Sequence, residues 1–173
     1  MPRISLKDIV NYLEYLADQH VDLKSKFRWN INEVSGAMRN GVELPLMAID
    51  SVETRTKGDA SKTLHANSIA FTILGKPNTK TGNLDESEAQ TEVLDFCQNI
   101  CFDIEARMLY DSRQLKDKDG NKNWLYRRFD KTSFHFFKVG PVYTDSLFGY
   151  RCELSFDNQE SMDPEITKWA DLD

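Results

Sequence analysis

The stretch FGYRCELSFD, residues 148–157, shows the clearest alternation of apolar and polar side chains in the sequence. Its apolar members occupy every second position: Phe148, Tyr150, Cys152, Leu154 and Phe156. A period of two is typical of a β-strand that has one face on a core and the other face toward solvent. The stretch therefore predicts a half-buried strand, and the rest of the chain must supply the layer that covers its apolar face.

Two amphipathic helices are predicted to supply that layer. The first spans residues 5–19, where Ser5 and Asp8 form a capping pattern and apolar residues recur at spacings of three and four. The second spans residues 86–112 and begins after Asp85 as N-cap. At 1.5 Å per residue, the second helix measures roughly 40 Å and crosses a whole domain.

Five further strands are predicted, at residues 26–32, 46–56, 67–75, 124–130 and 133–139. The strand at 67–75 is apolar on both faces, which is typical of a central strand. Glycine, proline and asparagine place loops or hairpin tips at residues 36–43, 57–63, 75–83 and 117–123. A short terminal helix is predicted to start at Asp163 as N-cap, with Pro164 at its first position, and to run through Trp169.

The resulting order, α-βββ-α-βββ-α, favours the α+β class. We expect a mostly antiparallel sheet with one long central helix and the N-terminal helix packed on it. Residues 1–173 are expected to form a single domain, in which 163–173 are a short C-terminal helix or tail.

Composition narrows the setting. The net charge of -6 disfavours a general nucleic-acid surface, which normally carries a basic patch. Three cysteines are too few for a disulfide framework, and no apolar run approaches the about 20 residues that cross a bilayer. The N-terminus lacks the apolar core of a signal peptide. We therefore expect no membrane contact and a reducing compartment.

The motifs that could carry chemistry fit ordinary structure better. Cys97 and Cys101 share a helix face and could offer zinc two ligands, but a structural site needs four, so they are predicted to be buried in the core. The loop at 75–82 lacks the Gly-Lys-Ser/Thr ending of a phosphate-binding loop. With Gly120 at the sixth position of a calcium loop, Leu115 and Tyr126 occupy ligand positions. No cofactor and no metal are predicted.

No catalytic residue is assigned either. The sequence contains no serine or cysteine on a strand-to-helix elbow of the G-x-S-x-G kind, so we expect that the protein is not an enzyme. An enzyme that gathers His135 with carboxylates from distant strands remains an alternative.

Basic and aromatic side chains crowd the second half of the chain. If residues 124–130 form a strand, alternation places Arg127 and Arg128 on opposite faces, which favours a rim of ion pairs, at a subunit contact, over a nucleic-acid patch. Phe134, Phe136 and Phe137 cannot all face one way, so one must reach the second face of the sheet. Core and interface are both compatible with this pattern. The candidate subunit or partner contacts are Trp124, Tyr126, Arg127, Arg128, Phe136, Phe137, Phe148, Tyr150 and Trp169.

In the order of its elements, the chain resembles the tail-terminator and tail-completion (neck) proteins of tailed bacteriophages. The likeness lies in the N-terminal amphipathic helix, the early strands with SIAFTILGKP (68–77), the long central helix, and the closing VGPVYTDSLFGYRCELSF (139–156). Such proteins often close with an aromatic-Gly-aromatic turn into alternating apolar residues, here Phe148, Gly149 and Tyr150.

The resemblance implies a structural virion component that is assembled in the host cytoplasm. Its subunits would form a ring of about six copies at the head-proximal end of the tail, where the ring ends the tail tube and joins it to the neck. Its partners would be the tail tube protein, neck or connector proteins and further copies of itself, with genome DNA passing through an acidic channel. The loops at 57–63, 75–83 and 117–123 would reach neighbouring rings.

Two alternatives stay open. A head-tail connector ring of another symmetry would occupy a similar place in the particle. From another class, an intracellular α+β domain could bind a small ligand with the aromatic-rich sheet as its pocket wall.

Overall fold

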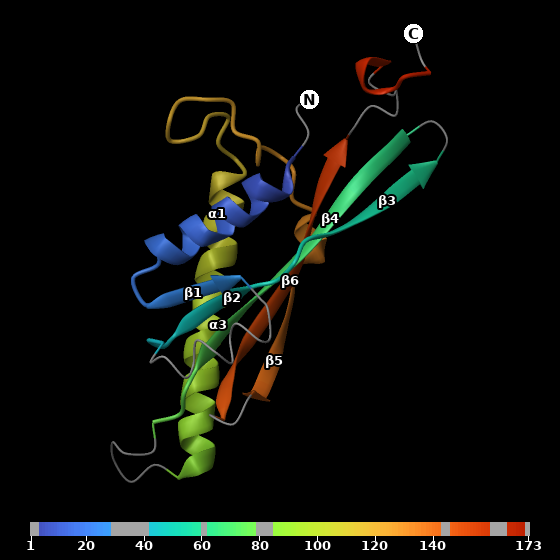
Figure 1. Cartoon of the computed structure of the whole chain (residues 1–173). Coiled ribbons are helices and arrows are strands. Elements are labelled where there is room, and N and C mark those ends of the chain that lie inside the picture. Colours follow the sequence, from blue (N-terminus) through green and yellow to red (C-terminus); the bar gives the residue numbers. More distant parts are fainter. Residues whose placement is uncertain are drawn as a thin grey trace.

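The computed structural model describes residues 4–28, 42–59, 62–78, 85–142, 146–159 and 166–171. Within these ranges the chain forms one sheet and two α-helices (Figure 1). The elements are α1 (Leu6–Gln19), β1 (Ser25–Arg28), β2 (Leu46–Ile49), β3 (Glu53–Asp59), β4 (Lys62–Gly75), α3 (Glu86–Asp111), β5 (His135–Val142) and β6 (Leu147–Gln159), with 3-10 turns η1 (Lys131–Ser133) and η2 (Ile166–Lys168).

The fold is α+β with a mixed six-stranded sheet. The strand order is β1-β2-β4-β6-β5, and β3 pairs with β4 beside this path. β1 and β2 run parallel, while the other pairings are antiparallel. β4 contacts three strands, which confirms the central position predicted for residues 67–75.

The longest pairing joins β4 to β6, from Leu64 opposite Gln159 to Gly75 opposite Phe148. Alternation along both strands separates two faces. One face carries the apolar side chains of Ile69, Phe71, Ile73, Cys152, Leu154 and Phe156, which pack with both helices in the main core. Both α1 and α3 lie on this side of the sheet, and the end of the β3–β4 hairpin reaches beyond them (Figure 1).

Both predicted helices are confirmed, including their starts. Ser5 and Asp8 form the capping box of α1, in which the Asp8 N–H donates to Ser5 Oγ and the Ser5 N–H donates to the Asp8 carboxylate. Asp85 caps α3 by accepting the Glu88 N–H at 2.8 Å. The buried residues of α3 are Ala89, Cys97, Ile100, Cys101, Ile104 and Met108.

The cysteines belong to this core, as predicted. Cys97, Cys101 and Cys152 are free thiols with no exposed surface. Burial disfavours the thiolate, so it raises the pKa of Cys97 from 9.0 to about 12 and raises the pKa values of the other two thiols as well. The thiols are therefore neutral in the folded protein at any ordinary pH.

The predictions for residues 46–56 and 57–63 need correction. The strand predicted at 46–56 is two strands, because residues 50–52 break it. β2 pairs with residues 71–74 and β3 with residues 62–68, so both follow the same edge of β4. Residues 57–63 were predicted as a loop or hairpin tip. They do belong to a hairpin, but its ladder continues to Asp59 opposite Lys62, so most of the segment is strand.

The strand predicted at 124–130 is wrong, so the order α-βββ-α-βββ-α is replaced by four strands before α3 and two after it. Residues 124–127 form turns, and Arg127 has a φ of 55°, which is incompatible with an extended strand. The Asn123 side chain donates to the carbonyls of Asp111 and Gln114, at 2.7 and 2.9 Å, and ties the segment to the end of α3. Leu125 is thereby buried, although it lies in a turn and not in a strand.

The remaining boundaries shift or lie outside the described residues. Residues 133–139 were predicted as a strand, and β5 runs from His135 to Val142 instead. The turn at 117–123 is confirmed, with Gly120 at a φ of 81°. The loop at 36–43, the tip of the 75–83 loop and the Asp163–Pro164 helix start fall largely or wholly outside the described ranges. The terminal helix is seen only as the 3-10 turn η2, which ends at Lys168, before Trp169.

Gly149 is required because the backbone of β4 leaves no room for a side chain at this position of β6. A Cβ at this position would lie 1.8 Å from the Ile73 carbonyl oxygen, which is backbone and cannot move aside. We expect Gly149→Ala to lower the free energy of unfolding by about 3 kcal/mol or more. Gly120→Ala is the control: its Cβ meets nothing within 4 Å and costs only the strain of its positive φ, about 1 kcal/mol. Urea unfolding measures both, and equal losses would contradict this role of Gly149.

The buried thiols also predict how stability depends on pH. Their pKa values are higher in the folded state than in the unfolded chain, so their stabilisation is complete below pH 9 and is lost as the pH rises further. Each thiol should contribute a slope of about -1.4 kcal/mol per pH unit between pH 9 and the folded pKa. Urea unfolding at pH 8 to 10.5 tests this, and Cys152→Ala should make the slope shallower by one thiol's share.

Candidate functional site

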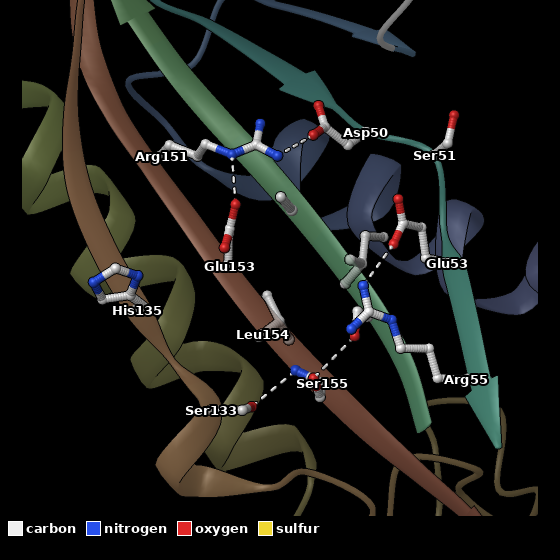
Figure 2. Close-up of a pocket in the computed structure, with 13 residues that line it drawn as sticks. Asp50, Ser51, Glu53, Arg55, Ser133, His135, Arg151, Glu153, Leu154 and Ser155 are labelled. Atoms are coloured by element: carbon white, nitrogen blue, oxygen red, sulfur yellow. Dashed lines mark hydrogen bonds and ion pairs between the residues drawn. The ribbon is translucent and has the colours of Figure 1, made fainter. Parts of the chain in front are cut away.

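A polar hollow lies on the face of the sheet opposite α1 and α3, which carries no helix among the described residues and is called the helix-free face below (Figure 2). Its volume is about 450 Å³. Its charged and hydroxyl side chains come from four strands and two connections: Asp50, Ser51, Glu53, Arg55, Ser68, Ser133, His135, Arg151, Glu153 and Ser155. The β4–β6 pairing therefore positions both the core and this hollow.

The floor of the hollow is made of small side chains. Ser68 and Ala70 of β4 lie beside Ser155 of β6 on the outward face, and the two serine hydroxyls are 3.3 Å apart. The Ser155 N–H donates to Ser133 Oγ at 2.8 Å, and the Ser133 hydroxyl donates to the Asp130 carbonyl. The Ser133 hydroxyl thus holds η1 against the sheet.

One side of the hollow is built around Arg151. Its guanidinium forms an ion pair with Asp50, a second one with Glu153 at 3.1 Å, and a hydrogen bond to Thr72 Oγ1 at 3.4 Å. The side chains of Arg151 and Asp50 are only 22% and 18% exposed. Burial works to lower the pKa of Arg151, but the hydrogen bonds to Asp50 and Glu153 outweigh burial and raise this pKa above its ordinary value.

Asp50 retains one unused acceptor. Its Oδ1 is buried and has no hydrogen-bond partner among the described residues, while the other oxygen binds Arg151. The Asp50 N–H donates to the Ala70 carbonyl at 2.9 Å, which fixes the residue at the break between β2 and β3. A buried acceptor without a donor is costly, so this atom favours a donor beyond the described residues.

The opposite wall is more open. Glu53 and Arg55 of β3 are joined at 3.6 Å, with side chains 71% and 76% exposed. From the far side, His135 of β5 stands opposite Glu153 in the strand register. Three carboxylates face two guanidinium groups in the hollow, and these guanidinium groups are already paired. The arrangement therefore suits a cationic or hydrogen-bond-donating group.

None of the nine candidate contact residues lines this hollow. Four of them lie on the helix side. Trp124 packs edge-on to Tyr12 at 5.9 Å, Phe136 packs edge-on to Phe102 at 5.1 Å, and Phe148 is buried. Tyr150 packs against the same core.

The other candidates are scattered. Arg128 is buried, which overturns the idea that strand alternation exposes it on a rim; Arg127 is exposed and stacks on Tyr126 at 5.1 Å. Phe137 lies on the helix-free face beside His135, with ring centroids 5.3 Å apart, so one phenylalanine does reach the second face as predicted. Trp169 is 55% exposed.

Sequence reasoning missed the hollow, although a signal for it was present. The outward positions of the strand at 148–157 are Arg151, Glu153 and Ser155, which all line the hollow or its wall. The expectation of an aromatic pocket wall is wrong for this hollow, because the aromatic side chains of β6 face the helices.

Comparison with known protein families found no matching family model, and comparison with curated proteins found no matching relative. Among the described residues, no helix is both long enough and apolar enough to span a bilayer. In the same ranges, no three side chains of His, Cys, Asp or Glu gather as a metal-binding group.

The Arg151–Asp50 pair should stabilise the fold measurably. Removing one partner leaves a mostly buried charge unpaired, so Asp50→Asn and Arg151→Met should each lower the free energy of unfolding by about 2 kcal/mol. The double variant should lose less than the sum of the single losses, with a coupling of about 1 kcal/mol or more from urea unfolding.

The exposed Glu53–Arg55 pair provides the matched control for this cycle. Glu53→Gln and Arg55→Met should couple by less than about 0.5 kcal/mol, because solvent screens this pair. Equal coupling in the two cycles would refute the special position of Arg151.

Proposed function

We propose that the protein is a structural virion subunit that assembles as a ring of about six copies at the head-proximal end of a phage tail. There the ring would end the tail tube and join it to the neck, with genome DNA passing through its channel. The partners are further copies of the chain, tail tube protein and neck or connector proteins.

The observation that carries this proposal is the difference between the two sides of the molecule. One face of the sheet is covered by α1 and α3, whereas the other carries the charged hollow beside a buried apolar cluster of Leu46, Ala48, Leu74 and Leu147, and the β3–β4 hairpin projects past both helices. Two unlike sides suit head-to-tail contacts, and head-to-tail contacts close into rings when the rotation per subunit divides a full turn.

Two further features support the proposal. Large apolar side chains are exposed on several elements, among them Phe96 and Phe102 of α3, Leu115 and Trp169. Exposed apolar side chains of this size are available for subunit or tube contacts. The net charge of -6 suits a channel wall past which DNA slides without adhering.

A head-tail connector is the nearest alternative, and copy number separates it from a terminator. A small-ligand-binding protein is a second candidate, favoured by the hollow of about 450 Å³, which lies within the size range of ligand pockets. Light scattering after size-exclusion chromatography, negative-stain images and a binding test with tail tube protein separate these functions. The ring proposal would be refuted if the protein is a monomer at all concentrations and does not bind tail tube protein.

Trp169 should contribute to assembly more than to folding. The Trp169 side chain is half exposed, and among the described residues it stacks on no other aromatic side chain. Trp169→Ala should therefore change the free energy of unfolding by less than about 0.5 kcal/mol. Ring formation should weaken about tenfold or more, since aromatic residues dominate interfaces. Removal of the residues after Met162 should act in the same direction.

Trp124→Ala serves as the contrasting variant, because Trp124 packs against the core and its loss should lower stability by about 3 kcal/mol. Sedimentation velocity and urea unfolding provide the two readings. If Trp169→Ala lowers stability as much as it lowers assembly, the residue belongs to the subunit's own fold.

A further inference from the structure

We propose that the hollow on the helix-free face receives the basic turn of a neighbouring copy of this chain. The basic turn is defined as residues 113–122, in which Arg113, Lys116, Lys118 and Lys122 outnumber Asp117 and Asp119. This inference rests on the proposed self-assembly and names the two surfaces that meet.

Among its described lining residues, the hollow has one more carboxylate than it has guanidinium groups. Asp50, Glu53 and Glu153 face only two guanidinium groups, and Asp50 Oδ1 is buried without a donor. An incoming ammonium or guanidinium group would balance the third carboxylate. The floor of small side chains leaves room for long side chains to enter.

The basic turn offers such groups in a preformed shape. Asp117 Oδ1 accepts the N–H groups of Asp119 and Asn121 at 3.0 and 2.8 Å, and Lys116 is bridged to Lys122 across the tip. The Asp117 carboxylate is therefore occupied in holding the turn. No ion pair joins Lys116 or Lys122 to a carboxylate among the described residues, and both side chains are exposed. A rigid turn loses little entropy when it binds.

The two surfaces lie on opposite layers of the subunit, so a turn cannot fill the hollow of its own chain. Lys118 Nζ lies 4.8 Å from the centre of the Tyr15 ring, which places the turn beside α1 on the helical side. The hollow opens on the other side of the sheet (Figures 1 and 2). A contact between unlike surfaces of two copies is heterologous, which is the geometry that a ring requires.

Reversal and exchange of charge test the contact directly. The hollow variant is Glu53→Lys with Glu153→Lys, and the turn variant is Lys116→Glu with Lys122→Glu. All four side chains are exposed, and urea unfolding checks the fold of the hollow variant, because Glu153→Lys removes an ion pair with Arg151. Each variant should weaken self-association by about tenfold or more in sedimentation velocity at fixed salt. The variant that combines all four changes should recover to within about threefold of the wild type.

A control variant separates this contact from a general charge effect. Asp22→Lys with Glu92→Lys changes the net charge as much as the hollow variant does, but at exposed sites away from the hollow, and should leave association unchanged. If the combined variant self-associates as weakly as the hollow variant and the turn variant do, while rings of the wild type still form, the inference is wrong and the ring proposal stands.

Cysteine cross-linking detects the contact even where self-association is too weak to measure by sedimentation velocity. Lys122→Cys in one copy and Ser51→Cys, at the rim of the hollow, in another should be joined by a short bismaleimide, because the native thiols are fully buried. The pair Lys122→Cys with Asp22→Cys is the control and should give no more product than random collisions. Failure to exceed this control would overturn the inference.

The mass of the product that forms when every copy carries both Lys122→Cys and Ser51→Cys separates the two proposals, because each copy can then be cross-linked on both sides. Cross-linked dimers or open chains, without rings at any concentration, would support the contact and refute the ring. Agmatine tests the competing occupant: if this guanidinium ligand binds the wild type but not the hollow variant, while association is equal in both, the hollow is a small-ligand site and the inference fails.

Discussion

The antiparallel pairing of β4 with β6 is the constraint on which the rest of the structure depends. It joins residues 64–75 to residues 148–159, so one ladder closes the loop of chain that contains α3 and β5. Closing so long a loop costs entropy that only a continuous ladder and a core can offset. The ladder also demands a close approach at one end, where Gly149 stands against the backbone of Ile73.

The same register determines both faces of the sheet. With a side-chain period of two, a slip by one residue would exchange the apolar set around Phe71 and Cys152 for the polar set around Thr72 and Arg151. The core therefore specifies the hollow. The hollow in turn stabilises the register, because Arg151 of β6 can bind Asp50 only when Arg151 lies opposite Thr72.

The parts of the fold that could be predicted are those in which one element carries its own period. The strand at 148–157 and the two helices met this condition, since their apolar faces pack on a single layer. The segment at 124–130 did not, because Asn123 ties it to α3 and its side chains enter the core through turns. The hollow escaped prediction because Asp50 and Arg151 lie 101 residues apart and meet only through the sheet register.

A polar face built in this way constrains how copies of the chain can meet. In a twofold contact each surface meets its own copy, and two hollows with an excess of carboxylates would repel each other. Two basic turns would repel each other in the same manner. In the proposed assembly, opposite charges attract where the hollow of one copy meets the basic turn of another, and these surfaces lie on opposite layers of the subunit. Electrostatics therefore favour head-to-tail addition over a closed dimer, and the angle between successive copies decides whether such addition ends in a ring.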